Sequence, residues 1–270
     1  MPLAVCATPI GNLDDVTLRV LRELAEADVV LCEDTRHTRG LLQRHGIDAR
    51  LLSYHEHNEA KRTAELIPRL EGGSRVAIVS DAGMPGISDP GARLVAAALG
   101  AGVPVTVLPG PSAVETALVA SGLAGDRYLF VGFLPRGARA REDLWAELAR
   151  LTHPVVAFES PRRLPAALAS LAAALPERPV AVCRELTKRY EQVVRGTAAD
   201  VASRFREPPK GEITLVVGGL EERGAEPGAG REAVQAVAEL VAAGVARRQA
   251  AQLVARLTGV SRNALYRDSL

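Results

Sequence analysis

Short apolar segments alternate with helical patterns along most of the chain, and this alternation restricts the fold more than any other feature. In the first half, strands are expected at residues 3–7, 28–32, 51–54, 75–80 and 103–108, and helices at 17–27 and 89–101. In the second half, strands are expected at 128–133, 154–158, 179–183, 191–195 and 212–217, and helices at 139–151 and 161–175. Alternation of this kind builds mainly parallel sheets that are covered by helices.

The pattern therefore predicts an α/β protein with two α/β domains and a small helical module. The first domain is expected at residues 1–125, and the second, with mixed strand directions, at 126–220. Residues 220–230 are rich in glycine and charge and lack periodic apolar residues, which is typical of a linker. Residues 231–270 are expected to form the helical module.

Net charge and cysteine content restrict the partners and the compartment. The formal net charge is +1, so a nucleic acid would have to be bound by local basic patches. Cys6, Cys32 and Cys183 are widely spaced within apolar runs, which is typical of reduced, buried thiols rather than a zinc site or a disulfide framework. The chain starts without a leader pattern, and no apolar stretch reaches about 18 residues. We therefore expect a cytoplasmic protein that does not enter a membrane.

Three segments rich in glycine and proline follow predicted strands. They are residues 7–12 (ATPIGN), 80–91 (SDAGMPGISDPG) and 108–113 (LPGPSA). Ligands of open α/β sheets bind beyond the carboxyl ends of the strands, and glycine lets the backbone approach a ligand closely. Each segment alone is more often a tight connection than a site, but together they predict a site at one edge of the first domain. None contains G-x-G-x-x-G or a Walker A lysine, which disfavours dinucleotide and P-loop sites.

Polar clusters follow other predicted strands, and each has two interpretations. Residues 33–38 (EDTRHT) either bind a ligand or form the N-cap and solvated first turn of a helix. Residues 55–59 (HEHNE) lack a recognisable ligand geometry, so a surface loop or a polar RNA contact is expected rather than a metal site. Arginines lie beside acids at 159–163 and 184–189, where they either contact phosphates or form surface ion pairs.

Six motifs in a fixed order carry a family resemblance. They are TPIGN at 8–12, EDTR at 33–36, SDAGMPGISDPG at 80–91, PGPSA at 109–113, FLPR at 133–136 and KGE at 210–212. They resemble the bacterial ribosomal RNA small subunit methyltransferase I family, a branch of the tetrapyrrole (corrin/porphyrin) methylase superfamily. The resemblance covers residues 3–218. It implies 2'-O-methylation of the ribose of a cytidine in 16S rRNA, at the ribosomal P-site region, with S-adenosylmethionine as the methyl donor.

The resemblance also implies a donor cleft between two α/β domains of the tetrapyrrole methylase type, and a homodimer. The residues that it places at the donor are Pro9, Gly11, Asp81, Gly83, Met84, Ile87, Ser112, Ala113, Phe133 and Leu134. Tetrapyrrole enzymes of the superfamily usually carry Gly-Pro-Gly-Asp after the first strand, whereas this chain has PIGN at 9–12. This departure disfavours a tetrapyrrole substrate but leaves the donor site in place.

Methyl transfer to a hydroxyl needs alignment of the reactants and a group that accepts the proton. The candidates for that group are Glu33, Asp34, His37, Glu56 and Lys188. A carboxylate of the Glu33–Asp34 pair is the preferred one. Arg36, Arg162 and Lys188 are expected to contact phosphates beside the target nucleotide. The alternative functions are a tetrapyrrole C-methylase of the same superfamily and a non-catalytic ribosome-binding protein, and the complete segment 80–91 disfavours the latter.

The last 40 residues carry apolar positions at helical spacing and then a short turn, TGVS at 258–261. Ser261 is a good N-cap for a further helix, so residues 249–266 predict a helix-turn-helix-like unit that exposes Arg262 and Arg267. Six arginines against three acids make residues 231–270 locally basic, which favours contact with the rRNA of the small ribosomal subunit. The alternative is a helical cap that docks on the second domain or on a dimer mate.

Overall fold

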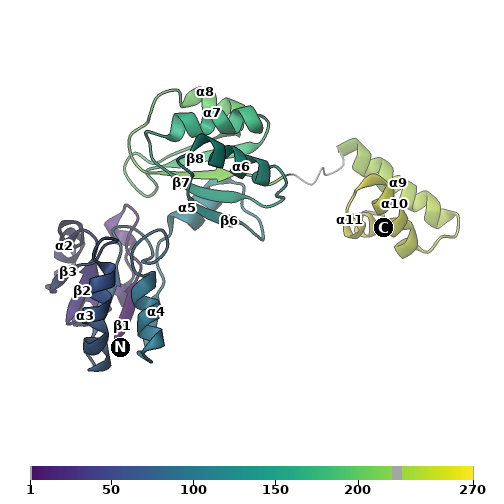
Figure 1. The fold of residues 1–270 in the computed structure, drawn as a ribbon. Coiled ribbons are helices and arrows are strands. Elements are labelled where there is room, and N and C mark those ends of the chain that lie inside the picture. The colour runs from purple at the N-terminus through teal and green to yellow at the C-terminus, as the bar shows by residue number, and fades with distance from the viewer. Residues whose placement is uncertain (1, 221–226, 270) are drawn as a thin grey trace. The chain divides into compact units, whose positions relative to one another are not determined.

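The computed structural model describes residues 2–220 and 227–269 of the chain. These residues form two compact units. The first unit comprises Met1–Leu148 and His153–Gly218, and the second comprises Ala149–Thr152 and Gly219–Leu270. The first unit contains two sheets, drawn from purple to blue and from teal to green in Figure 1, and the second unit is helical.

The first sheet is fully parallel, with the strand order β3-β2-β4-β1-β5. Its strands are β1 (Leu3–Cys6), β2 (Val29–Cys32), β3 (Leu51–Ser53), β4 (Val76–Val79) and β5 (Val105–Leu108). All four residues of β1, β2 and β4 are buried, because these inner strands are covered on both faces. The carboxyl ends of these strands therefore meet at one edge of the sheet.

Helices cover both faces of this sheet. They are α1 (Leu18–Glu26), α2 (Thr35–Arg44), α3 (Glu59–Glu71) and α4 (Ala92–Gly100), and a short 3-10 turn, η1 (Leu13–Asp15), precedes α1. Helices α1 and α2 contribute Val20, Leu24 and Leu42 to the core on one face. Helices α3 and α4 supply the opposite core, which contains Leu66 and Leu94. This is the doubly wound arrangement that alternating strands and helices predict.

The second sheet is mixed, with the strand order β6-β7-β10-β8-β9, as the sequence predicts. Its strands are β6 (Leu129–Phe133), β7 (Val155–Glu159), β8 (Pro179–Arg184), β9 (Gln192–Thr197) and β10 (Ile213–Val217). Strand β6 pairs parallel with β7, and the other three pairings are antiparallel. Strand β10, the last in the chain, lies in the middle of the sheet.

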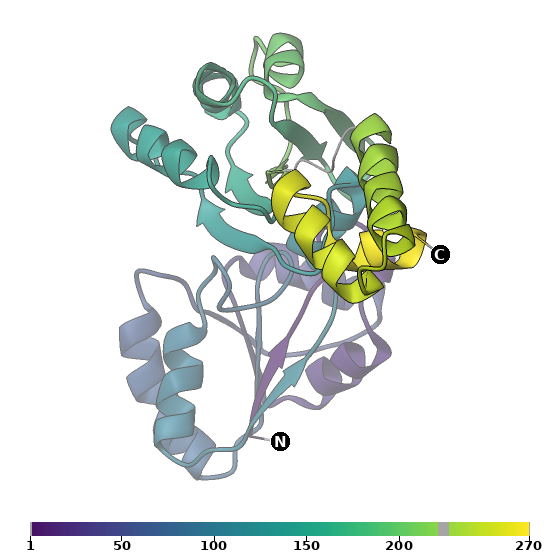
Figure 2. The same ribbon diagram turned by 90° about the vertical axis from the view of Figure 1, so that its right-hand side faces the viewer.

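Helices also cover both faces of the second sheet. They are α5 (Ala113–Ser121), α6 (Ala138–Leu148), α7 (Leu164–Ala174) and α8 (Ala198–Arg204). Helices α7 and α8 lie side by side in both views (Figures 1 and 2). Helix α5 packs on the opposite face through Val114, Ala117 and Leu118, which contact residues of β7, β8 and β10. The predicted first domain, residues 1–125, thus contributes a helix to the second sheet, and the domain limits remain a prediction.

The second unit contains three helices, α9 (Pro227–Ala242), α10 (Arg247–Thr258) and α11 (Arg262–Asp268), which pack as a small bundle (Figure 2). Its core is formed by Ala233, Val237, Ala250, Ala251, Val254 and Leu265. Helix α10 ends at Gly259, which has a φ of 75°, and Ser261 lies at the N-cap of α11. The short turn between two helices is the one predicted, although Ser261 makes no side-chain capping bond. No helix among the described residues is long and apolar enough to cross a membrane.

Several predicted boundaries are wrong. Helix α6 ends at Leu148 rather than at residue 151, and α7 begins at Leu164 rather than at residue 161. Helix α4 was predicted from Asp89 but begins at Ala92, because Gly91 has a φ of 136° and the Gly86 amide donates to the Pro90 carbonyl at 3.2 Å, which closes a loop in place of a first turn. The predicted linker at 220–230 is shorter, because α9 begins at Pro227, and its residues 221–226 lie outside the described part of the chain. Helices α2, α3, α5 and α8 had not been individually predicted.

Candidate functional site

The three segments rich in glycine and proline meet at the carboxyl edge of the first sheet. Strands β4, β1 and β5 are neighbours, so the segments that follow them start side by side. Thr8 and Gly83 form an isolated antiparallel bridge, with N–O distances of 2.9 and 3.1 Å. The Thr8 hydroxyl donates to the Ser80 carbonyl at 2.9 Å. A Cβ on Gly110 would lie 2.8 Å from the Cβ of Ala7, so only glycine permits this approach of the third segment.

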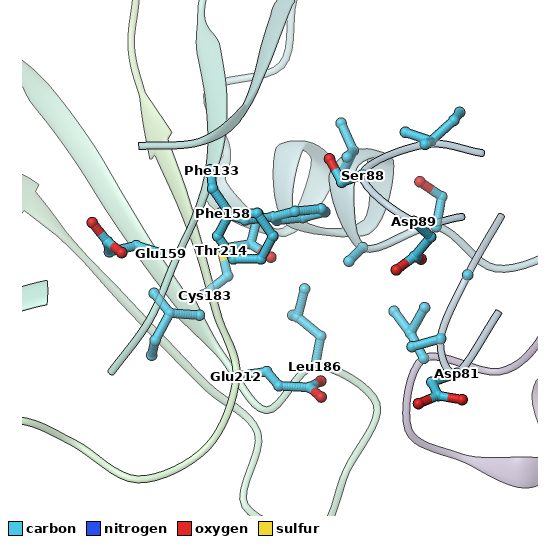
Figure 3. Close-up of a pocket in the computed structure, with 18 of the residues that line it drawn as sticks. Asp81, Ser88, Asp89, Phe133, Phe158, Glu159, Cys183, Leu186, Glu212 and Thr214 are labelled. Carbon is cyan, nitrogen blue, oxygen red and sulfur yellow. The ribbon is translucent and has the colours of Figure 1, made fainter. Parts of the chain in front are cut away.

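A cavity of about 500 Å³ opens at this edge, and Figure 3 shows the side chains that line it. From the first sheet and its connections, the lining comprises Ile10, Glu33, 81–84, 87–89 and 112–114. From the second sheet, it comprises Phe133, 158–161, Cys183, Leu186 and 211–214. The cavity therefore lies where the strand ends of the two sheets face each other, at the position where α/β folds bind ligands.

The wall from the second sheet is aromatic. The ring centroids of Phe133 and Phe158 lie 5.6 Å apart in an edge-to-face arrangement. The pairing of β6 with β7 shifts between Phe130 and Phe133, and Gly132 within the shift has a φ of 67°. Bulges of this kind redirect a side chain. Phe133 is 57% exposed and Ile87 across the cavity is 53% exposed, so two large apolar side chains are left for a ligand to cover.

The wall from the first sheet is acidic. Glu33, Asp81 and Asp89 line the cavity, and none of the three forms an ion pair with a described residue. Burial, followed by the negative charges of Glu33 and Asp81, raises the pKa of the Asp89 carboxyl to about 6. Burial and the charge of Asp81 also raise the pKa of Glu33. Burial opposes the charged forms of Glu33 and Asp89, and no cation among the described residues pairs with the three acids, so the wall favours a positively charged ligand.

Two further acids line the cavity, but each is paired with a cation. Oε1 of Glu159 lies 2.5 Å from the Arg163 guanidinium and accepts from the Ser160 amide at 2.6 Å. Oε2 of Glu212 accepts from the Lys188 ammonium at 2.9 Å. The uncompensated charge of the cavity therefore comes from the first sheet. Of the three acids, Asp81 and Asp89 lie opposite Phe133 and Phe158 in Figure 3.

The structure places the side chains of Glu33 and Asp34 in different surroundings. The side chain of Glu33 lines the cavity. Asp34 is the N-cap of α2, and its carboxylate accepts from the Arg36 amide at 2.8 Å and from the Arg36 guanidinium at 2.9 Å. These bonds lower the pKa of Asp34 to about 2. The N-cap interpretation of the segment 33–38 thus holds for Asp34, and ligand binding by Glu33 stays a prediction.

Gly11 and Lys188 lie at a close contact between the two sheets. A Cβ on Gly11 would lie 2.5 Å from Lys188 Cγ and 2.8 Å from the Leu186 carbonyl oxygen, and the Asn12 amide donates to Thr187 Oγ1 at 3.0 Å. The segment that receives Gly11 includes Glu185 and Thr187, which have φ values of 52° and 64°. Strain of this kind at non-glycine residues persists where the surroundings enforce it. The contact holds Leu186 in the cavity wall.

The remaining predicted residues are distributed as follows. Of the ten expected at the donor, seven line the cavity, namely Asp81, Gly83, Met84, Ile87, Ser112, Ala113 and Phe133. Pro9 and Leu134 are buried beside it, and Gly11 makes the contact with the second sheet. Arg36 and Arg162 are exposed, while the Lys188 ammonium lies between the carboxylates of Glu185 and Glu212 at 3.0 and 2.9 Å. Arg262 and Arg267 are exposed in the second unit.

Several lining residues had not been predicted. Ser88 and Asp89 stand in the motif at 80–91 and Glu212 in the motif at 210–212, so a search for every acid in the motifs would have found Asp89 and Glu212. Phe158, Glu159 and Thr214 lie within strands and carry no local signal. They reach the cavity through the order of the second sheet.

The described residues hold no group of three His, Cys, Asp or Glu side chains arranged to bind a metal ion. His55 pairs instead with the Asn58 side chain at 3.0 Å, in the turn before α3. The three cysteines are buried and free, as predicted. Burial raises the pKa of the Cys183 thiol, which lines the cavity, to about 11, so this thiol is neutral near pH 7.

Comparisons with known proteins agree with this architecture. Residues 2–202 match the family model of the Tetrapyrrole (Corrin/Porphyrin) Methylases. The ribosomal RNA small subunit methyltransferase I of Mesorhizobium japonicum is 45% identical, with 99% of this chain and 91% of that protein aligned. The protein of the same name from Synechocystis sp. is 43% identical, with 99% and 97% aligned. The crystal structure of uroporphyrin-III C-methyltransferase from Thermus thermophilus, complexed with S-adenosyl homocysteine, is 21% identical, covers 80% of this chain and 96% of that chain, and has a TM-score of 0.57.

The two α/β domains and the cavity between their strand ends define a methyltransferase of the tetrapyrrole methylase type. At 43 to 45% identity over nearly the whole length, the chain belongs to the ribosomal RNA small subunit methyltransferase I family. The resemblance predicted from the six motifs is confirmed. The likeness to the uroporphyrin enzyme supports the fold alone.

Proposed function

We propose that this protein transfers a methyl group from S-adenosylmethionine to the 2'-hydroxyl of a cytidine ribose in 16S rRNA, at the ribosomal P-site region. The observation that carries the proposal is a cavity lined by three carboxylates that have no ion-pair partner among the described residues, two of which, Asp81 and Asp89, lie opposite two phenylalanine rings (Figure 3). The donor carries a sulfonium, an ammonium and a flat adenine ring. Its positive charges match the acidic wall, and its ring matches the aromatic wall.

The residues of the cavity fit the donor in size as well as charge. A volume of about 500 Å³ lies within the usual range for small-ligand sites. Gly83, with a φ of 81°, brings backbone rather than a side chain to the cavity. Ile87 and Phe133 are proposed to cover the bound molecule and exclude water. Glu33 and Asp81 are proposed to bind its positive charge.

When bound, S-adenosylmethionine supplies an electrophilic methyl group, and the protein must present a nucleophile in line with it. The names of the curated relatives support rRNA of the small subunit as the source of that nucleophile. The cytidine and its 2'-oxygen are proposed from the family resemblance. Of the Glu33–Asp34 pair, Glu33 is the member proposed to act in the cavity, because the Asp34 carboxylate is occupied by Arg36.

An acidic cavity repels phosphates, so the RNA backbone must be held outside it. Exposed Arg36 and Arg162 are proposed to hold phosphates on either side of the target nucleotide. Lys188 contributes less than a free lysine would, because Glu185 and Glu212 already neutralise its charge. Arg262 and Arg267 of the helical unit are proposed as further RNA contacts. A homodimer and a cytoplasmic location follow from the same resemblance.

The experiment offers purified protein and radiolabelled S-adenosylmethionine to assembled small ribosomal subunits, to free 16S rRNA and to uroporphyrinogen III. Mass spectrometry of rRNA fragments then identifies the nucleoside, and resistance to alkali identifies a 2'-O-methyl group. We expect one methylated cytidine ribose in the ribosomal substrate. Methylation of a base atom alone, or of the tetrapyrrole alone, would overturn the proposal. Binding to subunits without transfer would favour a non-catalytic ribosome-binding protein.

A further inference from the structure

The proposed reaction needs a group that accepts the hydroxyl proton. Each of the three carboxylates in the cavity is a candidate for it. They lie in one wall, on connections from two neighbouring strands, since Glu33 follows β2 while Asp81 and Asp89 follow β4. In Figure 3, Asp81 and Asp89 lie on the side of the cavity opposite Phe133 and Phe158. Their hydrogen-bond partners and exposure distinguish them.

Asp81 is already engaged. Its Oδ1 accepts a hydrogen bond from the Asp34 backbone amide at 3.1 Å, which fixes the carboxylate against the first turn of α2. A carboxylate that accepts from a backbone amide is held in one orientation. This arrangement suits a group that binds a cation, and it is poorly suited to receiving and releasing a proton in each turnover.

Glu33 and Asp89 have no hydrogen-bond donor among the described residues, so both are available to accept a proton. Glu33 is exposed, and water competes for its carboxylate. Asp89 is half-buried at the boundary of the cavity. A proton acceptor that is partly shielded from water, yet able to exchange its proton with solvent, is best placed at such a boundary.

The backbone around Asp89 is held in an unusual conformation. Ser88, the residue before it, has a φ of 59°, and Gly86 and Gly91 have φ values of 85° and 136°. A non-glycine residue in the left-handed region is strained and persists where the surroundings enforce it. The hydrogen bond from the Gly86 amide to the Pro90 carbonyl closes the loop around Ser88, and a Cβ on Gly91 would lie 3.3 Å from Ile78 Cδ1, so the loop packs tightly there. The loop therefore fixes where the Asp89 carboxylate lies.

We infer that Asp89 is the catalytic base of this enzyme, accepting the proton of the ribose hydroxyl as the methyl group is transferred; this inference rests on the proposed function. The O–C bond forms at the 2'-oxygen while the S–C bond of the donor breaks, and its electron pair stays on sulfur. The hydroxyl proton passes to a carboxylate oxygen of Asp89 and leaves to solvent after the product.

The charges around Asp89 match this role. Glu33 from the end of β2 and Asp81 from the end of β4 are the charged groups whose fields raise its proton affinity, in addition to burial. Glu212 faces the same cavity from the second sheet, but Lys188 neutralises it. The resulting pKa of about 6 leaves Asp89 ionised at neutral pH, yet keeps it a stronger base than an ordinary aspartate.

The test compares wild-type enzyme with Asp89→Asn, Asp89→Glu and Glu33→Gln, using small ribosomal subunits and a range of donor concentrations. The wild-type kcat/KM for the donor should rise with pH through an inflection near the Asp89 pKa of about 6, because kcat/KM reports groups of the free enzyme. Asp89→Asn should lower kcat by about 100-fold or more and abolish the inflection, while the donor Kd changes by less than about 10-fold. Asp89→Glu should restore part of the rate. Glu33→Gln should move the inflection to lower pH, because it removes a negative charge beside Asp89.

A carbon-13 NMR titration of the carboxyl groups gives a readout that does not depend on activity. The wild-type spectrum should contain a carboxyl that titrates near pH 6, which is absent in Asp89→Asn and shifted down in Glu33→Gln. Full activity and an unchanged pH profile in Asp89→Asn would overturn Asp89 as the base while leaving ribose methylation standing. If wild-type enzyme methylates no ribose, both proposals are wrong. Should Asp89→Asn not fold, the shift of the inflection in Glu33→Gln decides the question.

Discussion

The backbone amide of Asp34 donates a hydrogen bond to Oδ1 of Asp81, across 3.1 Å. The two residues follow neighbouring strands, β2 and β4, so one bond joins the start of α2 to the loop at 80–91. The Asp34 carboxylate meanwhile caps its own helix through the Arg36 amide. The backbone amide of Asp34 therefore orients a cavity residue, and its side chain caps α2.

From this bond we predict that Asp81→Ala weakens S-adenosylmethionine binding by about 10- to 100-fold, the usual effect of losing a hydrogen-bonded charge. Asp81→Asn is the matched control, because an amide oxygen still accepts from Asp34 but carries no charge. If donor binding depends on the charge of Asp81, both variants should bind the donor weakly in calorimetric titration. Only Asp81→Ala should also melt at a lower temperature, because it alone loses the bond to Asp34. Unchanged affinity in both would remove Asp81 from the donor site.

The substitution Gly11→Ala tests the close contact between the two sheets. An added Cβ would lie 2.8 Å from the Leu186 carbonyl oxygen, and this backbone atom moves only with the strained segment around it. Gly11→Ala should lower the free energy of unfolding by about 1–3 kcal/mol and weaken donor binding, because Leu186 lines the cavity. Urea unfolding and calorimetry measure the two effects.

Gly40 is the control for that substitution. It lies inside α2, and a Cβ there would meet nothing within 4 Å. Gly40→Ala should therefore raise the free energy of unfolding by about 0.5–1 kcal/mol, the usual helix preference for alanine over glycine, and leave donor binding unchanged. A gain in stability from Gly11→Ala would contradict the close contact between the sheets.

The raised pKa of Asp89 predicts a pH-dependent stability. The folded-state pKa of about 6 lies above the ordinary value of 3.8, so the folded protein binds this proton more tightly than the unfolded chain does. The stability that the protonated Asp89 contributes is therefore lost as pH rises from about 4 to about 6, and the loss is complete above that range. Asp89→Asn should melt at a higher temperature than wild type near pH 8 and at nearly the same temperature near pH 4. A lower melting temperature near pH 8 would show that the Asp89 charge is stabilised in the fold.

Removal of the helical unit is expected to weaken substrate binding rather than donor binding. Removing residues 224–270 should leave donor affinity intact, because the cavity is lined only by residues of the first unit. Affinity for small ribosomal subunits should fall, and the difference from the full chain should be largest at low salt, where phosphate contacts contribute most.

The double variant Arg262→Gln with Arg267→Gln is the matched control for that truncation. Both side chains are exposed, so the substitutions should leave the bundle folded and reproduce part of the loss. Full binding by both proteins would contradict RNA contact, and loss of donor binding on truncation would favour docking on the enzyme body.

The alternation of strands and helices predicted both sheets, because each strand is short, apolar and bounded by glycine, proline or charge. It did not predict that α5 packs on the second sheet. That choice depends on Val114 and Leu118 meeting β7, β8 and β10, which are distant in sequence.

Part of the candidate site, like part of the fold, could be predicted from the sequence, and part could not. Motif residues such as Asp81 and Ile87 reach the cavity because they directly follow strands of the first sheet. Lys188 was predicted to contact phosphate, but its charge is neutralised by Glu212, which is brought beside it by the pairing of β10 with β8. No pattern around Lys188 contains that information. The sequence does not indicate Asp89 as a cavity residue, because an Asp-Pro pair is typical of the start of a helix.

The central position of β10 has a consequence for synthesis of the protein. The five strands of the first sheet are complete once residue 108 has been made, so that sheet can form while the rest of the chain is still being translated. Strands β7 and β8 then wait with unpaired edges, since the strand that separates them is made last. Because residues 211–214 also line the cavity, the cavity stays incomplete until β10 has emerged and inserted. The order of synthesis therefore leaves the new chain with an unfinished cavity and with exposed strand edges, which can pair with other strands, until β10 has been made.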